Sequence, residues 1–153
     1  MVDVSTLVSA ILDAEGIEGL SISGGEPFLQ ASALSELLCE VRNVRPELGV
    51  ILYTGMLYEE WLEDEDAGNL LQYIDLLIDG AYMESLDDGK PMRGSSNQRL
   101  LFLTNRYQES DLPLFRKNEV LFSDGYFKVI GIPSKGAKLM INTLKADNME
   151  EST

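Results

Sequence analysis

The sequence predicts an α/β fold built on a parallel sheet, and three observations support this prediction. Short apolar runs begin near positions 17, 49, 74 and 99 and recur every 25–32 residues. Helical patterns separate most of them, and such βα repetition is typical of right-handed parallel sheets. A chain of 153 residues is long enough for one domain with a core. We expect that domain at residues 1–146, followed by a disordered tail at 147–153.

The first half of the chain alternates helical and strand patterns. Residues 3–15 are predicted to form a helix capped by Asp3 or Ser5 and stopped by Gly16. Its apolar positions follow helical spacing: Leu7, Val8, Ile11 and Leu12. Residues 17–23 alternate in strand fashion. A second helix is predicted over about residues 30–44, with one apolar face: Leu34, Leu37, Leu38 and Val41.

The next segments continue the repetition. Residues 49–54, "GVILYT", form an apolar run typical of a parallel strand covered on both faces. Residues 57–73 read as a helix with a very acidic outer face. Buried strands are predicted at 74–80 and 99–104.

The pattern changes after residue 108. "NEVLFSDGYFKVIGIP" predicts a β-hairpin with Asp124 and Gly125 at its turn. At the other end, a helix feeds the first buried strand and no strand precedes it. We therefore expect a partial sheet that lacks its first strand.

Charge is unevenly distributed along the chain. Residues 1–89 carry 19 acidic and two basic side chains (−17), residues 90–146 carry ten basic and four acidic ones (+6), and the tail adds −3, for a net charge of −14. An acidic chain is a poor candidate for binding nucleic acid, and we expect none. The basic second half is either ordinary solubility charge or a surface for an acidic partner or anionic ligand.

Two further features limit the location of the protein and the kinds of site it can form. No apolar run approaches the roughly 18 residues that span a membrane, so we expect a cytoplasmic protein. Cys39 is the single cysteine, which excludes an internal disulfide and argues against a metal site built from several thiolates. Its place in the predicted second helix, beside Leu37, Leu38 and Val41, predicts a buried structural thiol.

The stretch "SISGGEPFLQ" (21–30) is the strongest candidate for a ligand site. Gly24 and Gly25 follow a strand, at the carboxyl edge where α/β sheets bind ligands, and glycine lets a ligand approach the main chain closely. Glu26 can accept charge-assisted hydrogen bonds from a cationic group. Pro27 ends the strand and donates no hydrogen bond. These residues favour an ammonium-bearing ligand; the alternative is a tight strand-to-helix turn.

This stretch resembles the Gly-Gly-Glu-Pro motif of the radical S-adenosylmethionine enzymes, which holds the amino group of the methionine moiety. "GVILYTGMLYEE", "IDLLIDGAYMESLDDGKPMRGSSNQRLL" and "GIP" further resemble the activating enzymes of glycyl radical proteins, and most closely the activase of anaerobic ribonucleoside-triphosphate reductase. The likeness runs from about residue 3 to residue 107. It implies a partial parallel (βα) barrel of the radical S-adenosylmethionine type, followed by the C-terminal hairpin.

The resemblance implies cofactor contacts from Gly24, Gly25, Glu26 and Pro27. The strand ends at Tyr53, Thr54 and Asp79 would border the same pocket.

Asp79 would meet a ribose hydroxyl or an ammonium group, or else be a solvated acid at a strand end. Arg93 and Arg99 would pair with a carboxylate of the cofactor or partner, with hydrogen bonds from Ser95, Ser96 and Asn97; the alternative is a polar turn. The lysine of an Asp-x-Lys pair found in some related activases is absent, because Gly80 and Ala81 follow Asp79.

The family's chemistry begins at a [4Fe–4S] cluster held by three cysteines in a loop after the first strand, where electron transfer splits S-adenosylmethionine to a 5′-deoxyadenosyl radical. This chain has no such loop. The missing loop and missing strand together predict a truncated chain, with the cluster present only in the intact protein. In-frame DNA upstream of Met1 would then encode the three cysteines, and early stop codons there would contradict this.

Three hypotheses remain. In the first, the intact protein is an activase that installs a glycyl radical on anaerobic ribonucleotide reductase, with flavodoxin or ferredoxin as electron donor. In the second, the chain is a cluster-free module that binds S-adenosylmethionine or a partner without radical chemistry. In the third, it is a partly folded fragment that associates through an exposed sheet edge.

Overall fold

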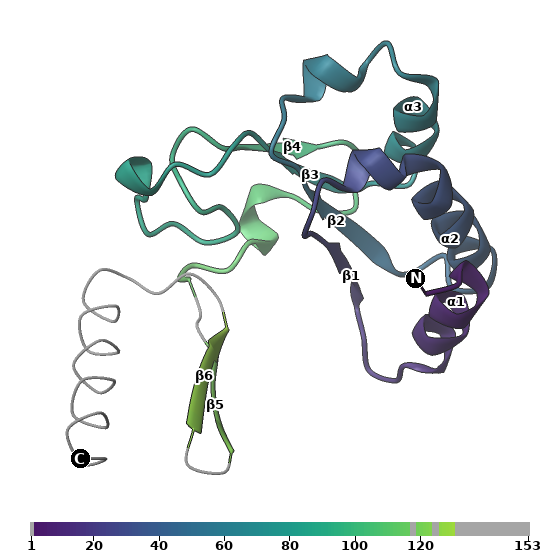
Figure 1. The fold of residues 1–153 in the computed structure, drawn as a ribbon, viewed down its shortest axis with the longest axis horizontal. Helices are drawn as coiled ribbons and strands as arrows, with labels where there is room; N and C mark the ends of the chain where they lie inside the picture. The colour runs from purple at the N-terminus through teal and green to yellow at the C-terminus, as the bar shows by residue number, and fades with distance from the viewer. Residues whose placement is uncertain (1, 117–118, 124–125, 131–153) are drawn as a thin grey trace, which may run out of the picture.

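The computed structural model describes residues 2–116, 119–123 and 126–130 (Figure 1). Three α-helices and a four-stranded sheet form its main body, in this order: α1 (Val4–Asp13), β1 (Gly19–Ile22), α2 (Ala31–Val44), β2 (Gly49–Tyr53), α3 (Glu65–Leu71), β3 (Leu76–Asp79) and β4 (Arg99–Phe102). A hairpin of β5 (Glu119–Ser123) and β6 (Tyr126–Ile130) follows. Short 3₁₀ segments occupy Pro27–Gln30, Tyr58–Trp61, Glu84–Leu86 and Glu109–Asp111.

The sheet has the order β1-β2-β3-β4, and its first three strands are parallel, as predicted. Consecutive strands are neighbours, so the carboxyl ends of β1, β2 and β3 meet at one edge. The prediction of a wholly parallel sheet is wrong for β4, which pairs antiparallel with β3. A parallel return needs a crossover, usually a helix, but the connection between β3 and β4 holds only the three-residue 3₁₀ segment Glu84–Leu86. Gln98 Nε2 donates to the Gly80 carbonyl (2.8 Å), so β4 starts where β3 ends.

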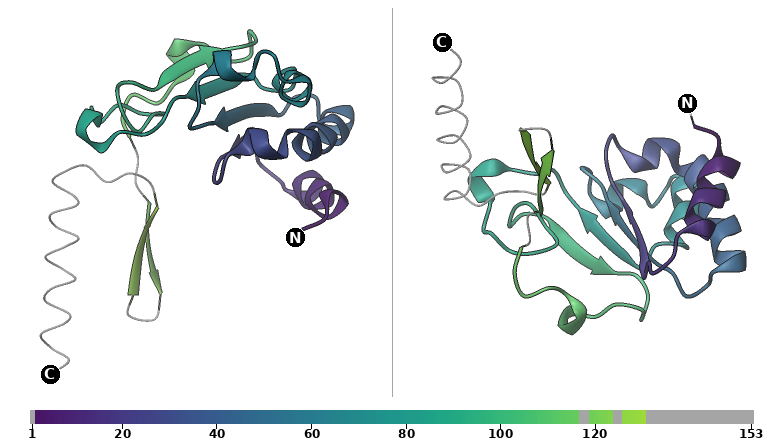
Figure 2. Two further views of the ribbon diagram at one scale, coloured as in Figure 1. Left: turned by 45° about the horizontal axis from the view of Figure 1, so that its top comes forward. Right: turned by 90° about the horizontal axis from the view of Figure 1, so that it is seen from below.

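All three helices lie side by side on one face of the sheet (Figures 1 and 2). The core fills the space between them and the sheet, with the predicted apolar face of α2 packed inward. Its buried members include Val8, Leu37, Leu38, Val41, Val50, Leu52, Leu70 and Leu77. α1 contributes less than predicted: Leu7 is exposed because α1 is the outermost helix and packs against α2.

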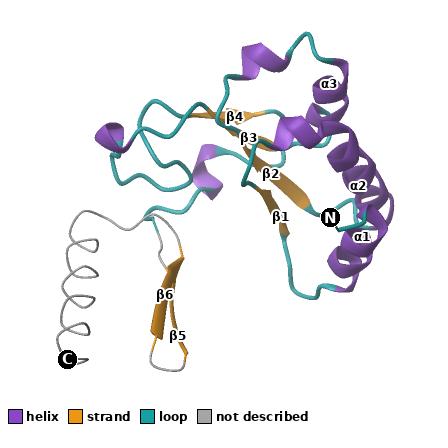
Figure 3. Cartoon of the chain, viewed as in Figure 1, coloured by secondary structure: helices purple, strands orange, loops and turns teal. Residues whose placement is uncertain are grey.

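The helix predicted at 57–73 is broken in two (Figure 3). The 3₁₀ segment Tyr58–Trp61 ends, and α3 starts afresh after Asp64, whose side chain accepts a hydrogen bond from the Ala67 N–H (2.8 Å). An aspartate that caps a helix in this way holds its own backbone extended and starts a new helix there. Before the break, Gly55 contacts the turn after β1 and Tyr58 contacts the end of β3.

The predicted hairpin is confirmed by the antiparallel pairing of β5 and β6, with Ser123 opposite Tyr126. Its turn residues, Asp124 and Gly125, lie outside the described residues, as does the predicted tail at 147–153. Among the residues that the structure describes, no helix is both long and apolar enough to cross a bilayer.

Candidate functional site

The turn after β1 is built on two glycines with left-handed backbone. Gly24 has a φ of +90° and Gly25 a φ of +57°, and a Cβ built on either would have no atom within 4 Å. The backbone conformation, rather than crowding, therefore requires glycine at both positions. The open space beside them leaves the main chain of this turn accessible to a ligand.

Glu26 is held at the end of the neighbouring strand. Its Oε1 accepts from Thr54 Oγ1 (2.8 Å) and from the Phe28 N–H (3.3 Å), and its Oε2 accepts from the Gly55 N–H (3.0 Å). Thr54 is only 3% exposed, so this contact anchors the turn. Glu26 therefore lies where the ends of β1 and β2 meet.

The ends of β2 and β3 are joined to the same network. Thr54 N–H donates to the Ile78 carbonyl (2.9 Å), Met56 N–H donates to Thr54 Oγ1 (3.1 Å), and Gly80 N–H donates to the Met56 carbonyl (3.0 Å). Tyr53 precedes this group at the end of β2, and burial raises its pKa. Three successive strand ends thus form one hydrogen-bonded rim.

Glu26 is a half-buried carboxylate with donors but without a cation. No Lys or Arg side chain in the described part of the chain forms an ion pair with it. Its three hydrogen bonds leave about one of the roughly four acceptor sites of a carboxylate unused. This arrangement suits a cationic ligand group, because the negative charge is positioned but not neutralised.

An aromatic pair supports the two loops that carry this rim. Phe28, next to Pro27 in the turn after β1, stacks on Trp61 from the loop after β2, with ring centroids 4.7 Å apart and planes at 24°. Pro27 and Phe28 are both buried, which fixes the exit of the chain from the glycine turn. Trp61 is the single tryptophan, so its fluorescence reports on this region.

Asp79 and Arg99 form a second cluster at the same edge. Asp79 is 0% exposed, so the alternative of a solvated acid is wrong. It accepts from the Tyr58 N–H (2.8 Å) and from Arg99, whose Nε donates to Oδ1 (2.9 Å). Burial raises the pKa of Asp79, but the hydrogen bonds from Arg99 and Tyr58 outweigh this effect and the pKa lies below its ordinary value. The other edge of Arg99 contacts Glu59.

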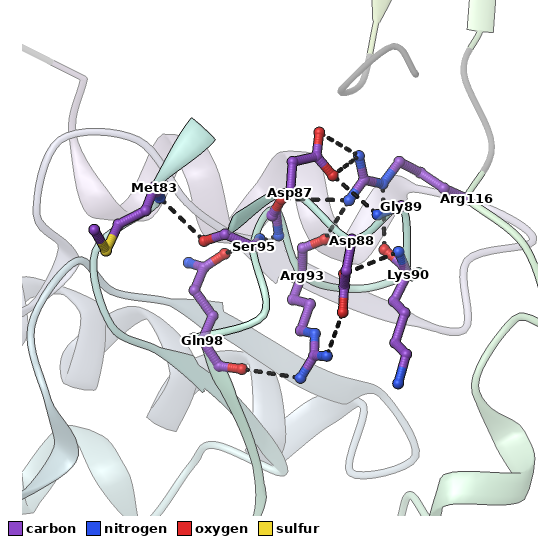
Figure 4. Close-up of polar contacts among 10 residues, drawn as sticks. Met83, Asp87, Asp88, Gly89, Lys90, Arg93, Ser95, Gln98 and Arg116 are labelled. Atoms are coloured by element: carbon purple, nitrogen blue, oxygen red, sulfur yellow. Dashed lines mark hydrogen bonds and ion pairs between the residues drawn. The ribbon is translucent and has the colours of Figure 1, made fainter. Parts of the chain in front are cut away.

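The loop between β3 and β4 is ordered by its own polar contacts (Figure 4). Arg93 donates to Asp88 Oδ2 (2.6 Å) and to the Gln98 carbonyl (3.3 Å), and Ser95 Oγ accepts from the Met83 N–H (3.0 Å). Asn97 Nδ2 donates to the Ala81 carbonyl (2.8 Å). Arg93 and Asn97 therefore stabilise this loop, as the polar-turn alternative predicts, and do not contact the turn that holds Glu26.

Arg93 also lines a cavity of about 500 Å³ beside β4. Its walls come from the loop after β3, from Leu100 and Phe102 of β4, and from residues 109–114. None of the rim residues around Glu26 lines it, so it is a separate feature of the fold.

A polar network that the sequence did not predict lies at the opposite, amino edge of the sheet. Asp75 is buried and accepts from Arg42 Nη2 (2.7 Å), Thr104 Oγ1 (2.7 Å) and the Val50 N–H (2.8 Å). Arg106 lies nearby, with its Nε 3.5 Å from Oδ2. The partners are 25 to 33 residues away along the chain, so no local motif reveals this network. It holds the sheet together at the edge away from the candidate site.

Comparison with known proteins places the chain in a family. The model of a family described as a 4Fe-4S single cluster domain matches residues 3–101. The chain belongs to this 4Fe-4S single cluster domain family. The match covers α1 through most of β4, and so all of the strand ends around Glu26 and Asp79.

The curated relatives that this chain matches share one name. An anaerobic ribonucleoside-triphosphate reductase-activating protein of Enterobacteria phage T4 is 37% identical over 86 residues, 55% of this chain and 53% of the relative. Those of Vibrio cholerae and Haemophilus influenzae are 41% identical over 83 residues and 34% identical over 84, covering 52–53% of both chains in each case. The chain spans about half the length of these relatives. No solved structure matches it.

These 153 residues do not supply the donors for the cluster that the family is named for. Iron–sulfur clusters are held by several cysteine thiolates, and Cys39 is the single cysteine. It lies in α2 and is half-buried, not fully buried as predicted. Asn43 Nδ2 lies 3.9 Å from its sulfur, and a hydrogen bond with Cys39 raises the pKa of Tyr73. Within the described ranges, no group of three or more His, Cys, Asp or Glu side chains could hold a metal ion.

Proposed function

We propose that this chain binds S-adenosylmethionine at the carboxyl edge of its sheet, as part of a protein that activates anaerobic ribonucleotide reductase. The curated relatives carry that activity in their names, and the Gly-Gly-Glu-Pro turn resembles the motif that holds the cofactor's amino group. In such an activating protein, a [4Fe–4S] cluster and an electron donor such as flavodoxin or ferredoxin would supply the reducing electron.

The observation that carries the proposal is the environment of Glu26. Thr54 and the Gly55 N–H position its carboxylate, and no cationic side chain among the described residues neutralises it. A ligand ammonium group would complete this site with a charge-assisted hydrogen bond. The exposed glycines beside it leave room for the rest of the methionine moiety.

The chain's own residues bind and orient the ligand in this proposal. Glu26 would accept from the ammonium group, and the open main chain of Gly24 and Gly25 would leave space for the rest of the ligand. Pro27 directs the chain away from the ligand and into the buried Phe28–Trp61 stack. Cluster chemistry is not assigned to any residue of this chain, because the required thiolates are not among its side chains.

Trp61 fluorescence tests the proposal directly, since Trp61 stacks on Phe28, two residues from Glu26. We expect S-adenosylmethionine to bind with a saturable change in emission, confirmed by calorimetry. A Glu26→Gln variant should bind it about 10- to 100-fold more weakly, the usual range for one lost charge-assisted hydrogen bond.

5′-Methylthioadenosine is the matched control ligand, because it keeps the adenosine and lacks the ammonium group. Its affinity should be the same for the variant and the natural chain if the turn stays intact. A natural chain that does not bind S-adenosylmethionine would contradict the proposal. So would a Glu26→Gln variant that binds both ligands as tightly as the natural chain does.

A cluster-free binding module is the second candidate, and the single cysteine favours it. It differs from the first in what the chain does with the reductase. Calorimetry against the anaerobic reductase measures partner binding by the chain itself. Because these 153 residues lack the cluster thiolates, the activase is tested with the chain joined to a three-cysteine cluster segment, under reducing conditions with S-adenosylmethionine. A glycyl radical signal in electron paramagnetic resonance then supports an activase, and binding of the reductase without a radical supports a module.

A further inference from the structure

Arg99 presents two edges of its guanidinium to two different carboxylates. On the inner edge, Nε donates to Asp79 Oδ1 (2.9 Å) and Nη2 donates to Asp79 Oδ2. On the outer edge, Nη1 and Nη2 donate to Glu59 Oε1 and Oε2 at 3.0 and 2.7 Å. The outer contact is a bidentate fork, the geometry in which arginine binds carboxylate ligands.

The two carboxylates differ in how firmly they are held. The side chain of Asp79 is 0% exposed and also accepts from the Tyr58 N–H, so it is a fixed part of the sheet edge. The side chain of Glu59 is 57% exposed and that of Arg99 is 41% exposed. Exposed ion pairs contribute little net stability. Asp79 therefore orients Arg99 permanently, whereas Glu59 can leave at small cost.

The same short loop connects this fork to the Glu26 site. Gly55 N–H donates to Glu26, and three residues later Tyr58 N–H donates to Asp79. Residues 55–58 thus contact Glu26, which can accept from a cation, at one end, and Asp79, which orients the donor fork of Arg99, at the other. Glu59 follows directly and belongs to the 3₁₀ segment Tyr58–Trp61.

We propose that the outer edge of Arg99 is a carboxylate-binding subsite, which Glu59 fills and from which a ligand carboxylate displaces it. The exchange keeps two hydrogen bonds to the same two nitrogens, so the guanidinium needs no rearrangement. Glu59 then acts as a competitor that weakens ligand binding. A purely structural latch between residues 58–61 and β4 predicts the opposite, because removal of Glu59 would loosen the loop and gain nothing in affinity.

The subsite can be tested without S-adenosylmethionine, and so independently of the proposed function. Acetate is the probe, titrated at constant ionic strength while the Arg99 Nε–H resonance is followed by NMR. An Arg99→Lys variant, in which that resonance disappears, assigns it. We expect acetate to shift the resonance and a Glu59→Gln variant to bind acetate about two- to fivefold more tightly, the range set by the strength of an exposed ion pair.

Glu63→Gln is the matched control, because Glu63 is exposed, lies four residues further on and loses the same charge. It should leave acetate affinity nearly unchanged. This result would distinguish the removal of Glu59 as a competitor from a general weakening of the repulsion between acetate and the acidic surface. Acetamide, which carries no charge, should not shift the resonance in any variant.

The source of the carboxylate follows from a second pair of ligands, S-adenosylmethionine and its decarboxylated analogue. If Glu59→Gln binds S-adenosylmethionine more tightly than the natural chain does, but not the decarboxylated analogue, the subsite is supported with the cofactor as its ligand. A gain for acetate but for neither nucleoside would support a subsite for another carboxylate. Unchanged or weaker acetate binding by Glu59→Gln, or an equal gain in Glu63→Gln, would overturn the inference.

Discussion

Thr54→Val is the sharpest single test of the rim at the carboxyl edge of the sheet. Valine has the shape of threonine but lacks the hydroxyl, which here donates to Glu26 Oε1 (2.8 Å) and accepts from the Met56 N–H (3.1 Å). The substitution therefore removes two hydrogen bonds and creates no cavity.

The expected cost follows from the environment of each bond. A hydrogen bond to a charged group contributes about 1.5–3 kcal/mol, and the half-buried position of Glu26 favours the lower end because water can partly replace the hydroxyl. Met56 is exposed, so its freed N–H can bond to water at a cost below about 1 kcal/mol. We expect the free energy of unfolding to fall by about 2 kcal/mol. Thr54→Ser, which keeps the hydroxyl and loses a methyl group, should cost less than about 1 kcal/mol.

Urea unfolding followed by the fluorescence of Trp61, which is 9% exposed in the fold, measures these changes. A double-mutant cycle of Thr54→Val with Glu26→Ala should show a coupling of about 1–2 kcal/mol, and Thr54→Ser with Glu26→Ala a smaller one. Coupling within about 0.5 kcal/mol of zero for Thr54→Val would refute the anchoring of Glu26 by Thr54.

Two other predictions concern the sheet itself. Gly19→Ala would place its Cβ 2.4 Å from the Gly49 carbonyl oxygen on β2, so we expect the free energy of unfolding to fall by at least about 2 kcal/mol. Gly68→Ala in α3, where nothing lies within 4 Å of the new Cβ, should instead raise it by about 0.5–1 kcal/mol. Equal effects of the two variants in urea titrations would contradict the close approach of β1 to β2. The pKa of Asp79 lies below its ordinary 3.8, so its ionised pair with Arg99 stabilises the fold at neutral pH and is lost as the pH falls below about 3.8. Acid titration of stability should be shallower below that pH for Asp79→Asn, and an unchanged profile would show that the pair does not contribute.

Much of the local structure is encoded within short windows of sequence. The apolar spacing of α2, the continuous apolar runs of β2 and β3, and the paired patterns of β5 and β6 predicted these elements with nearly correct bounds. The two glycines followed by Glu26 and Pro27 also predicted a turn at the carboxyl edge. Periodicity and backbone freedom decide these features, and both depend on neighbours within a few residues.

Other features depend on which segments meet in space. The pattern of residues 99–104 predicted a strand correctly, but the parallel direction expected for it was wrong. Its direction follows from the bond between Gln98 and Gly80 and from the short connection, which holds no crossover helix, between β3 and β4. The pairing of Arg99 with Asp79 and Glu59, 20 and 40 residues away, is likewise invisible to any local pattern.

The residues alone thus determined that a glycine turn with an acid would end β1, because only backbone conformation and local chemistry are needed to form it. The tertiary structure decided what that acid and its neighbours contact. Glu26 meets Thr54 because parallel pairing brings the ends of β1 and β2 together, and Asp79 is taken by Arg99 because β4 runs back beside β3. Such contacts are set by the alignment of whole strands, so they exist only once the sheet has formed.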